Sequence, residues 1–440
     1  MWESFAPGGP IRVGGHHYAE RFLRDGWRVA WCVGPLSPVN FIKSNVETRA
    51  RMRLWSRGGD RLHDGRMFAY APMTLAPFRP YPLFDRPAVQ RRTLRATLPR
   101  FKGVLERAGF GAIDLLWMST GSPLLALLDD VPHGLSIYRM SDDTAAFPDT
   151  PRTFGAIERE TCRRADLVLA TARLLENRAR ELGASRVLYL PNACEPERFM
   201  PGTVPEPIDL QGTPRPRAIY AGAIDGWFDA TLVRDVARLL PGWTFLLLGP
   251  ARAETGALRG LANVRLLGPR AYADLPAYLG AADAGIVPFV LNALTHAIHP
   301  LKVYEYCAAG LPVVATPMRE TAAMGAPMRQ AATADAFAAA LEEARGDGPG
   351  RRAERLEFAR RNTWDQRFAV LRSEIAALSG RRSPLAAGGR GGASRRRSAW
   401  RRPCRARCRS RPAGRATGAS GSCTSCPRSS RAAPSCRSCG

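Results

Sequence analysis

The sequence has 440 residues, more than one ordinary domain, and its hydrophobic fraction of 45% supplies apolar material for two cores. The formal net charge of +25 is typical of nucleic-acid-binding proteins, but residues 381–440 alone hold 16 arginines and no acidic residue, so residues 1–380 carry 48 basic and 39 acidic side chains. The part expected to fold is therefore only mildly basic. No run approaches the roughly 20 apolar residues of a membrane span, and we expect no signal peptide.

In the first half of the chain, short apolar runs alternate with helical patterns, which is typical of a parallel sheet wound with helices on both faces. The predicted strands are residues 27–33, 113–118, 135–140, 166–170 and 187–190. The predicted helices are residues 15–24, a long helix near 87–108, and residues 151–164 and 172–182, with Thr150 and Pro151 as a start signal. Residues 1–10 contain no strand-like run, so we expect most of the first strand to be missing.

The second half begins with five prolines in residues 201–217, which we interpret as a linker between two lobes. Strands are then predicted at residues 218–221, 244–248, 264–267, 284–288 and 312–315, and a helical stretch over 352–378 is expected to cross back onto the first lobe from residue 363 onward. The predicted domains are residues 1–200, a linker over 201–216, residues 217–362, a crossing helix over 363–380 and a tail over 381–440. The predicted fold class is α/β, with two Rossmann-like doubly wound parallel-sheet lobes.

The most specific motif runs from His299 to Ala315, with the sequence HPLKVYEYCAAGLPVVA. A proline at the start, Lys302 and Glu305 three residues apart on one face, and Gly310 as a stop predict a helix followed by a buried strand. The helix N-terminus and Lys302 suit a diphosphate, and Glu305 can accept hydrogen bonds from ribose hydroxyls. The alternative is a surface Lys–Glu pair on a packing helix, but the strands predicted on both sides favour the ligand-binding interpretation.

This motif resembles the sugar-nucleotide segment of GT-B glycosyltransferases, in which Glu305 takes the place of the ribose-binding glutamate. The resemblance spans roughly residues 11–380 and rests also on four weaker segments: residues 13–18 (VGGHHY), 190–193 (LPNA) with Phe199, 220–223 (YAGA) and 363–367 (TWDQR). It implies an enzyme that moves a sugar from a nucleoside-diphosphate donor, with a UDP-sugar favoured, to an acceptor held between the lobes. The donor is then a co-substrate, and no other cofactor is expected.

The other predicted donor-binding residues follow strands of the second lobe or flank Lys302. They are Gly222, Asp225, Gly249, Pro288, His299 and Leu301. A tight turn after the first strand of this lobe lets the backbone approach a phosphate, and the residues around Pro288 would line the nucleotide base. The six histidines are scattered and no Asp-x-Asp motif is present, so we predict no metal site.

The predicted catalytic base follows the strand at residues 135–140. Retaining relatives carry a second glutamate eight residues before the ribose-binding one, but Ala297 stands there, so the resemblance is closer to the inverting glucuronosyltransferase of xanthan assembly and its relatives. In these relatives the base lies in a tyrosine–arginine–x–serine–aspartate segment, which corresponds to residues 138–142 and maps to Asp142. Asp143 is the neighbouring candidate, and either aspartate could instead cap the following turn.

Gly14, Gly15 and His16 are predicted to bind the acceptor, and His17 is a further candidate for contact with the acceptor or for the base. The alternative is that histidines at a helix start are structural. The resemblance implies a glycan or lipid-linked acceptor and a cytoplasmic protein that is peripheral on the inner membrane face. Residues 41–57, in which basic side chains alternate with Phe, Met, Leu and Trp, fit an interfacial helix, with an ordinary solvated helix as the alternative.

Four of the ten cysteines, Cys32, Cys162, Cys194 and Cys307, lie in apolar or helical runs and are expected to be reduced and buried. The tail over residues 381–440 holds the other six but almost no large apolar side chain, which favours a disordered extension over a zinc module, although a basic arm that contacts lipid or nucleic acid is an alternative. For the whole chain, the alternatives are a nucleotide-sugar epimerase of the same fold and a nucleic-acid-binding protein that acts through the tail; we expect no nucleic-acid partner.

Overall fold

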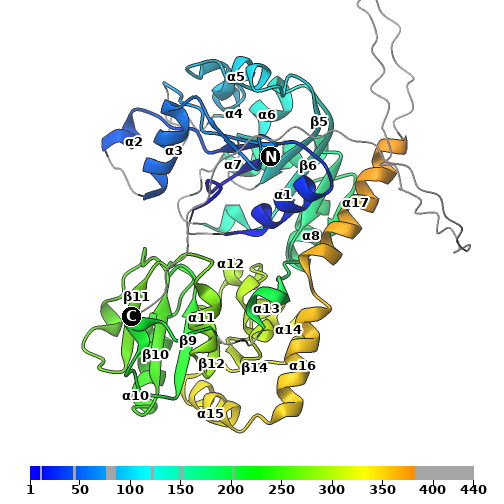
Figure 1. The fold of residues 1–440 in the computed structure, drawn as a ribbon. Helices are drawn as coiled ribbons and strands as arrows, with labels where there is room; N and C mark the ends of the chain where they lie inside the picture. Colours follow the sequence, from blue (N-terminus) through cyan, green and yellow to red (C-terminus); the bar gives the residue numbers. More distant parts are fainter. Residues whose placement is uncertain are drawn as a thin grey trace, which may run out of the picture. The chain divides into compact units, whose positions relative to one another are not determined.

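The computed structural model describes residues 1–9, 12–42, 46–75, 86–119, 123–147, 150, 153–200, 202 and 204–381. These residues form two lobes, each built on a mostly parallel sheet covered by helices (Figure 1). Both lobes belong to one compact unit of the chain. The predicted fold class, two Rossmann-like α/β lobes, is confirmed.

The first lobe contains an eight-stranded sheet. Its strands are β1 (Trp2–Glu3), β2 (Val29–Val33), β3 (Asp60–Leu62), β4 (Met67–Tyr70), β5 (Ile113–Ser119), β6 (His133–Met140), β7 (Leu167–Ala170) and β8 (Val187–Tyr189). Their spatial order is β3-β4-β2-β1-β5-β6-β7-β8, and all neighbours are parallel except β3 and β4. The chain order switches direction between β1 and β5, which is where open α/β sheets bind ligands.

The helices of the first half of the chain are α1 (Gly14–Arg24), α2 (Val39–Ile42), α3 (Val46–Ser56), α4 (Pro87–Gln90), α5 (Phe101–Arg107), α6 (Leu124–Asp130), α7 (Phe154–Arg164), α8 (Arg173–Glu181) and α9 (Pro196–Phe199). The last of them, α9, packs against the second lobe, where Phe199 joins the apolar core. The predicted strands and helices of this half are all present, apart from the long helix near residues 87–108. Pro151, part of the expected start signal of α7, lies outside the described residues.

Trp2–Glu3 forms a strand of two residues, β1, between β2 and β5, within the residues 1–10 that contain no strand-like run. One expectation for the first lobe needs correction. The predicted long helix near residues 87–108 is broken into α4, a 3-10 turn at Thr93–Ala96, and α5. The helix is interrupted because Thr97 pairs with Thr74 in an isolated bridge, and because Pro99 has no N–H group and disfavours helical backbone at the residue before it.

The second lobe contains a six-stranded, fully parallel sheet. Its strands are β9 (Arg217–Ala221), β10 (Thr244–Leu248), β11 (Val264–Gly268), β12 (Ala284–Val287), β13 (Val313–Ala315) and β14 (Arg329–Gln330). The order β11-β10-β9-β12-β13-β14 is the order of dinucleotide-binding sheets, so the switch point lies between β9 and β12. All five predicted strands of this half are present.

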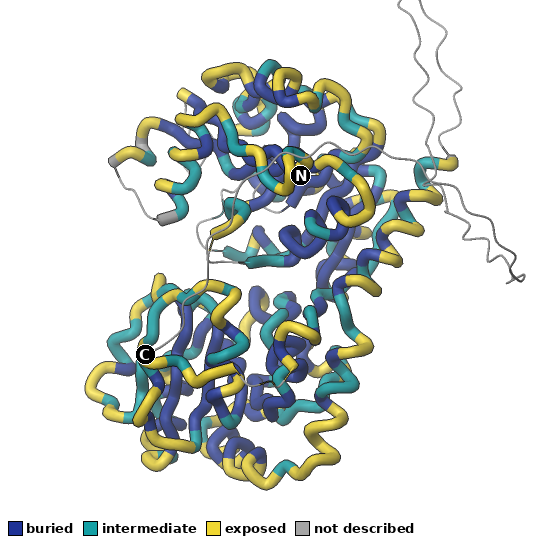
Figure 2. Tube along the Cα trace, in the orientation of Figure 1, coloured by how far each residue is buried: buried dark blue, intermediate teal, exposed yellow. Residues whose placement is uncertain are grey.

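The helices of the second half are α10 (Ala230–Leu239), α11 (Leu275–Gly280), α12 (Ala293–His296), α13 (Leu301–Ala308), α14 (Arg319–Ala323), α15 (Ala334–Arg345), α16 (Pro349–Arg360) and α17 (Trp364–Arg381). Both sheets are buried along most of their length (Figure 2). α17 returns to the first lobe, where Trp364, Phe368 and Leu371 join the apolar cluster that contains Tyr18 and Phe22 of α1. This is the predicted crossing helix.

The four cysteines of the folded part are free and buried, as expected. No helix among the described residues is both long enough and apolar enough to pass through a bilayer. The tail predictions concern residues outside the described part of the chain.

Candidate functional site

Lys302 lies in the first turn of α13, close to the switch point of the second sheet. Its Nζ atom lies 4.0 Å from the ring centre of Tyr220 at the end of β9 and 4.6 Å from that of Phe289 after β12. Burial lowers the pKa of Lys302 to about 7, and the charge of Glu305 only partly opposes this. The ammonium group is therefore held against two aromatic faces rather than in bulk solvent, in a position where an anion would restore its full charge.

Gly222 and Gly249 form the turns after β9 and β10. A Cβ atom at Gly222 would lie 2.8 Å from Nζ of Lys302, and one at Gly249 would overlap the carbonyl oxygen of Gly222. Their φ angles, +155° and +145°, also disfavour other residues. Close packing thus requires glycine at both positions. The same packing brings two backbone turns and Lys302 together at the carboxyl edge of the sheet.

Glu305 lies one turn after Lys302, and only 3% of its surface is exposed. Burial raises the pKa of Glu305 to about 7, although Tyr272 and Lys302 act to lower it. Neither the Tyr272 hydroxyl nor Oε1 of Glu305 makes a hydrogen bond of good geometry within the described part of the chain. A buried carboxylate oxygen without a partner is costly, so this position suits a ligand that donates hydrogen bonds.

The remaining predicted donor residues are placed in different surroundings. Oδ1 of Asp225 accepts a hydrogen bond from the next backbone N–H, that of Gly226, and the carbonyl of Pro288 accepts one from Asp229. Leu301 packs against the apolar cluster of the first lobe. Both ring nitrogens of His299 are engaged by protein groups, which leaves this side chain no free nitrogen for a donor.

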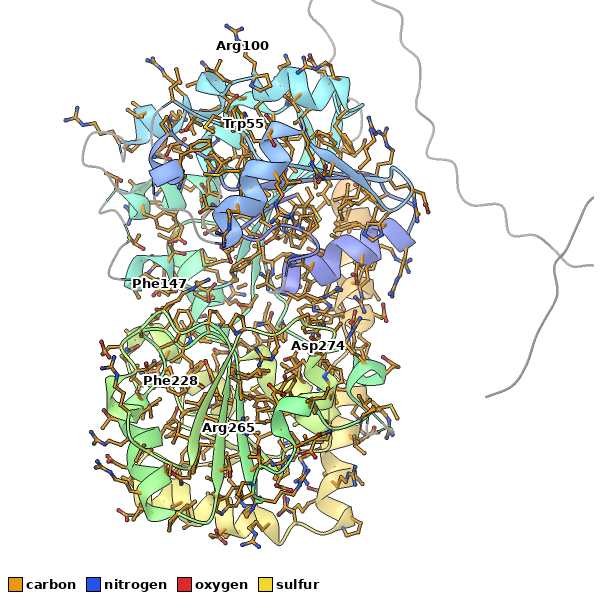
Figure 3. The ribbon with its side chains drawn as sticks, turned by 60° about the vertical axis from the view of Figure 1, so that its left-hand side comes forward. Trp55, Arg100, Phe147, Phe228, Arg265 and Asp274 are labelled. Atoms are coloured by element: carbon orange, nitrogen blue, oxygen red, sulfur yellow. The ribbon has the colours of Figure 1, made fainter. Side chains whose placement is uncertain are left out.

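Asp142 follows β6, at the carboxyl edge of the first sheet. Burial raises the pKa of Asp142, while a 2.9 Å hydrogen bond from Ser141 and the charge of Arg139 act to lower it. A few residues later, the ring of Phe147 lies 6.4 Å from that of Trp227, which follows the Gly222 turn of the second lobe. The segment after Asp142 therefore contacts the segment after Gly222 (Phe147 and the neighbouring Phe228 are labelled in Figure 3).

Asp143 has a different environment from Asp142. Its Oδ1 atom lies 3.4 Å from Nη1 of Arg178, which also binds the buried Glu158 at 2.9 Å. Asp143 stands at the cap position of the 3-10 turn Thr144–Ala146, but its side chain makes no capping hydrogen bond. Asp143 is thus tied into an ion-pair network of the first lobe, whereas Asp142 forms no ion pair with any of the described residues.

Gly14 and Gly15 begin α1 beside two charged side chains. A Cβ atom at Gly14 would lie 2.5 Å from Nη2 of Arg139, and one at Gly15 would overlap the carboxylate of Glu3. The ring of His16 packs against that of Trp31 in a tilted arrangement, with 4.7 Å between ring centres, and its ring nitrogens contact backbone groups of residues 13 and 6. Packing accounts for these three residues, so their role in acceptor binding stays a prediction.

His17 is fully buried where the two lobes meet. Its Nδ1 atom lies 3.2 Å from the Glu195 carboxylate, its ring stacks on Trp364 at 4.7 Å, and its ring centre lies 5.9 Å from that of Tyr272 in the second lobe. Within the described residues, Nε2 of His17 has no hydrogen-bond partner. Burial lowers the pKa of His17 to about 4, although the hydrogen bond with Glu195 opposes this. His17 is therefore a neutral imidazole with one free nitrogen, and a role as the base stays a prediction. Its ring lies at the contact between the two lobes.

The burial of His17 makes the protein sensitive to acid. Its pKa is 6.5 in the unfolded chain and about 4 when folded, so the unfolded state binds the extra proton in this window and stability falls as pH falls. The contribution of His17 should be a loss of about 2 kcal/mol in unfolding free energy from pH 6.5 to pH 5. The raised pKa of Glu305 acts in the opposite direction over this range, so the quantity to compare is the change in the wild type minus the change in His17→Asn, both from urea titrations. The control His133→Asn should change with pH as the wild type does, and the same change in His17→Asn would remove His17 as a cause.

Among the described residues, one group of His, Cys, Asp and Glu side chains has ligand atoms close enough to share an ion: His17, Glu20 and Glu195, with atoms within 4.8 Å of one another. Arg12 forms an ion pair with Glu20, and Nη1 of Arg21 lies 3.4 Å from Glu195. Because guanidinium groups already neutralise both carboxylates, the group resembles an ion-pair network more than a cation site.

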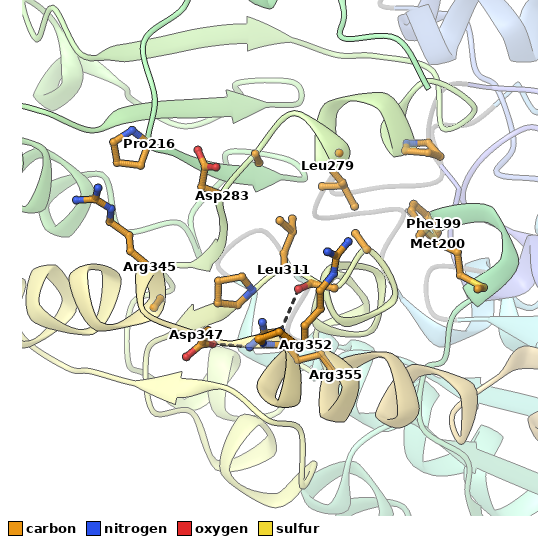
Figure 4. A pocket seen from close by; sticks show the side chains of 18 of the residues that line it. Phe199, Met200, Pro216, Leu279, Asp283, Leu311, Arg345, Asp347, Arg352 and Arg355 are labelled. Carbon is orange, nitrogen blue, oxygen red and sulfur yellow. Dashed lines mark hydrogen bonds and ion pairs between the residues drawn. The ribbon is translucent and has the colours of Figure 1, made fainter. Parts of the chain in front are cut away.

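A cavity of about 750 Å³ opens at the opposite edge of the second sheet (Figure 4). Its walls include Pro216, Asp283 and Pro312, which precede β9, β12 and β13, together with Arg352 and Arg355 of α16. It lies at the amino ends of the strands, so it is separate from the turns that hold Lys302.

Two aromatic residues of the site were not predicted as site residues. Tyr220 is the last residue but one of β9 and lies two residues before Gly222, so its position near a strand end was a usable signal. Tyr272 lies in the loop after β11, and no local pattern marks it. Its contacts with His17 and Arg12 of the first lobe exist only because distant segments meet.

Comparison with known proteins identifies the second lobe. Residues 215–347 match the protein family described as Glycosyl transferases group 1. A stretch of 150 residues, 33% of this chain, is 32% identical to TuaH of Bacillus subtilis (strain 168), a glycosyltransferase assigned to teichuronic acid biosynthesis. The match spans 38% of the length of TuaH.

Solved structures share the arrangement of both lobes. Sucrose-phosphate synthase from Thermosynechococcus elongatus superimposes with a TM-score of 0.64 at 16% identity, over 86% of this chain and 98% of that chain. HepE from Anabaena, solved in complex with UDP and glucose, gives a TM-score of 0.58 at 15% identity over the same shares. At these identities the likeness shows the fold, which is the GT-B fold.

Proposed function

We propose that this chain, which has the GT-B fold and a group 1 glycosyltransferase domain as its second lobe, transfers a sugar from a nucleoside-diphosphate donor to a glycan or lipid-linked acceptor. The observation that carries the proposal is the pair on α13. Lys302 is a partly buried cation beside two glycine turns, and Glu305 is a buried carboxylate with an unsatisfied oxygen. A cation and an acceptor on adjacent turns fit a diphosphate joined to a ribose.

The donor we propose is a UDP-sugar. HepE, which shares the fold, has also been solved in complex with UDP-glucose. The assignment of TuaH to teichuronic acid biosynthesis supports a glycan acceptor. A group 1 glycosyltransferase domain favours sugar transfer over epimerisation or nucleic-acid binding as the main activity.

In the proposed reaction, Asp142 takes the proton from the attacking acceptor hydroxyl. A bond forms between that oxygen and the anomeric carbon, the bond from the anomeric carbon to the phosphate oxygen breaks, and the diphosphate leaves with the electron pair. Lys302 neutralises the charge that develops on the leaving group. Direct displacement inverts the anomeric centre, and it is supported by Ala297, a buried apolar residue where retaining relatives carry a glutamate.

The proposed reaction needs no divalent ion, because Lys302 and the N-terminus of α13 supply positive charge to the diphosphate. We also propose contact with the inner membrane face through α3 and its neighbour α2. Phe41 of α2 is 51% exposed, and α3 carries exposed arginines. Leu54 of the same helix packs into the core, and the Trp55 indole (labelled in Figure 3) donates to the Leu98 carbonyl, so only part of this surface is available to lipid.

A thermal-shift screen of the full chain against nucleoside diphosphates and their sugars tests the proposal. A ligand that binds only the folded state stabilises it, by about 2.7 kcal/mol at a hundredfold excess over the dissociation constant. UDP and at least one UDP-sugar are expected to raise the melting temperature, while uridine without the diphosphate should not. If no nucleoside diphosphate shifts the melting temperature, the proposal fails.

A further inference from the structure

Residues 297–301 of the second lobe are embedded in the first lobe. Ala297 belongs to one apolar cluster of the first lobe, and Leu301 packs against another. These residues lead directly into α13, so their position determines where the first turn of that helix lies. Two polar side chains, Asn192 and Glu320, hold this segment through the backbone and the ring of His299.

Asn192 follows β8 of the first lobe. Its Oδ1 atom accepts a 3.1 Å hydrogen bond from Nη2 of Arg139, and its Nδ2 atom donates a 2.8 Å hydrogen bond to the carbonyl of His299. Both ends of the amide are thus used, which fixes its orientation. Arg139 lies three residues before Asp142 on the same strand end, so one side chain joins the segment of the proposed base to the start of α13.

Glu320 makes the second connection, from α14 of the second lobe. Its Oε1 atom accepts a 2.8 Å hydrogen bond from the backbone N–H of Arg173, the first residue of α8 in the first lobe. Its Oε2 atom lies 3.2 Å from Nδ1 of His299, whose Nε2 lies 2.8 Å from the Tyr304 hydroxyl. A carboxylate only accepts, so Nδ1 of His299 carries the proton and Nε2 accepts from Tyr304.

We infer that Asn192 and Glu320 are positioning residues that clasp residues 297–301 onto the first lobe and thereby set the placement of Lys302 and Glu305 relative to Asp142. The inference rests on the proposed function. His299 is the shared partner of both residues: its backbone carbonyl accepts from Asn192, and Nδ1 of its ring contacts Glu320. Neither Asn192 nor Glu320 needs to touch the donor or the acceptor. Their effect should therefore appear in turnover and not in nucleotide affinity.

The test uses Asn192→Asp and Glu320→Gln in the full chain. Aspartate cannot donate to the His299 carbonyl, and glutamine cannot accept from both Arg173 and His299. We expect kcat for UDP release from the active UDP-sugar to fall about 10- to 100-fold, because a misplaced catalytic group costs rate steeply. The dissociation constant for UDP should stay within about a factor of two. Hydrogen–deuterium exchange at the start of α8 should be faster in Glu320→Ala, since the Arg173 N–H then loses its acceptor.

Glu357→Gln is the matched control, because Glu357 lies on α16 in a solvent-exposed pair with Arg361. It should change none of these quantities. Unchanged kcat in both test variants would overturn the inference, and so would a loss of UDP affinity equal to the loss of rate, which would place the defect inside the donor lobe. If the wild type neither binds UDP nor releases it, the proposed function fails. The exchange rate then still decides the clasp, because protection at Arg173 that survives in Glu320→Ala contradicts it.

Discussion

Replacing Asp142 by asparagine should reduce the rate of sugar transfer by about 10²- to 10⁴-fold, the usual contribution of a general base. Asparagine keeps the size of the side chain and can still accept the hydrogen bond from Ser141, but it cannot take a proton. UDP affinity should stay within about a factor of two, because the donor contacts lie on α13. Initial rates of UDP release and a direct binding titration measure the two effects separately.

The matched variant is Asp143→Asn. Asp143 pairs with Arg178 at a partly exposed position, so its loss should cost less than about 1 kcal/mol of stability and should leave transfer nearly unchanged. Full activity in Asp142→Asn together with a strong loss in Asp143→Asn would assign the base to Asp143.

The pH dependence of the transfer rate gives a second check on the role of Asp142. Burial raises the pKa of Asp142, so on acidification the transfer rate of the wild type should begin to fall at a pH above the usual pKa of an aspartate. The rate of Asp142→Asn should lack this acidic fall.

Replacing Lys302 by methionine should weaken UDP binding by roughly 10- to 100-fold, since a charge-assisted contact contributes about 1.5–3 kcal/mol. Methionine retains most of the apolar stem that lies between Tyr220 and Phe289, so the aromatic packing should survive. Isothermal titration with UDP measures the change. Lys102→Met is the control, because Lys102 is exposed on α5, and it should bind UDP as the wild type does.

The pH dependence of this effect distinguishes charge from packing. Burial lowers the pKa of Lys302 to about 7, so the free protein loses the ammonium charge as pH rises above 7, whereas a bound diphosphate favours the charged form. Binding above pH 7 should therefore take up a proton, and the advantage of the wild type over Lys302→Met should shrink between pH 7 and pH 9. Glu305 also has a pKa of about 7, and its loss of a proton should change UDP affinity in the opposite direction in both proteins. The quantity to compare is therefore the ratio of the UDP affinity of the wild type to that of Lys302→Met. A ratio that does not change with pH would contradict the assigned role of Lys302.

Local sequence patterns were sufficient for most of the second lobe. Apolar runs of strand length separated by helical patterns gave β9 to β13, and the proline, Lys302, Glu305 and Gly310 in one motif gave α13 and its end. The patterns failed where chain geometry depends on partners elsewhere. β1 is two residues long and is a strand because β2 and β5 lie on both sides of it.

The sequence by itself determined that two parallel α/β lobes form and that a lysine and a glutamate share the first turns of a helix, because strand periodicity, helix spacing and stop signals act over a few neighbouring residues. Only the tertiary structure decided that the ammonium group of Lys302 lies against the rings of Tyr220 and Phe289. The tertiary structure alone also decided that the His299 carbonyl accepts a hydrogen bond from Asn192, which lies 107 residues earlier in the chain. Such contacts depend on how two lobes pack, and packing is a property of complementary surfaces that no local pattern specifies.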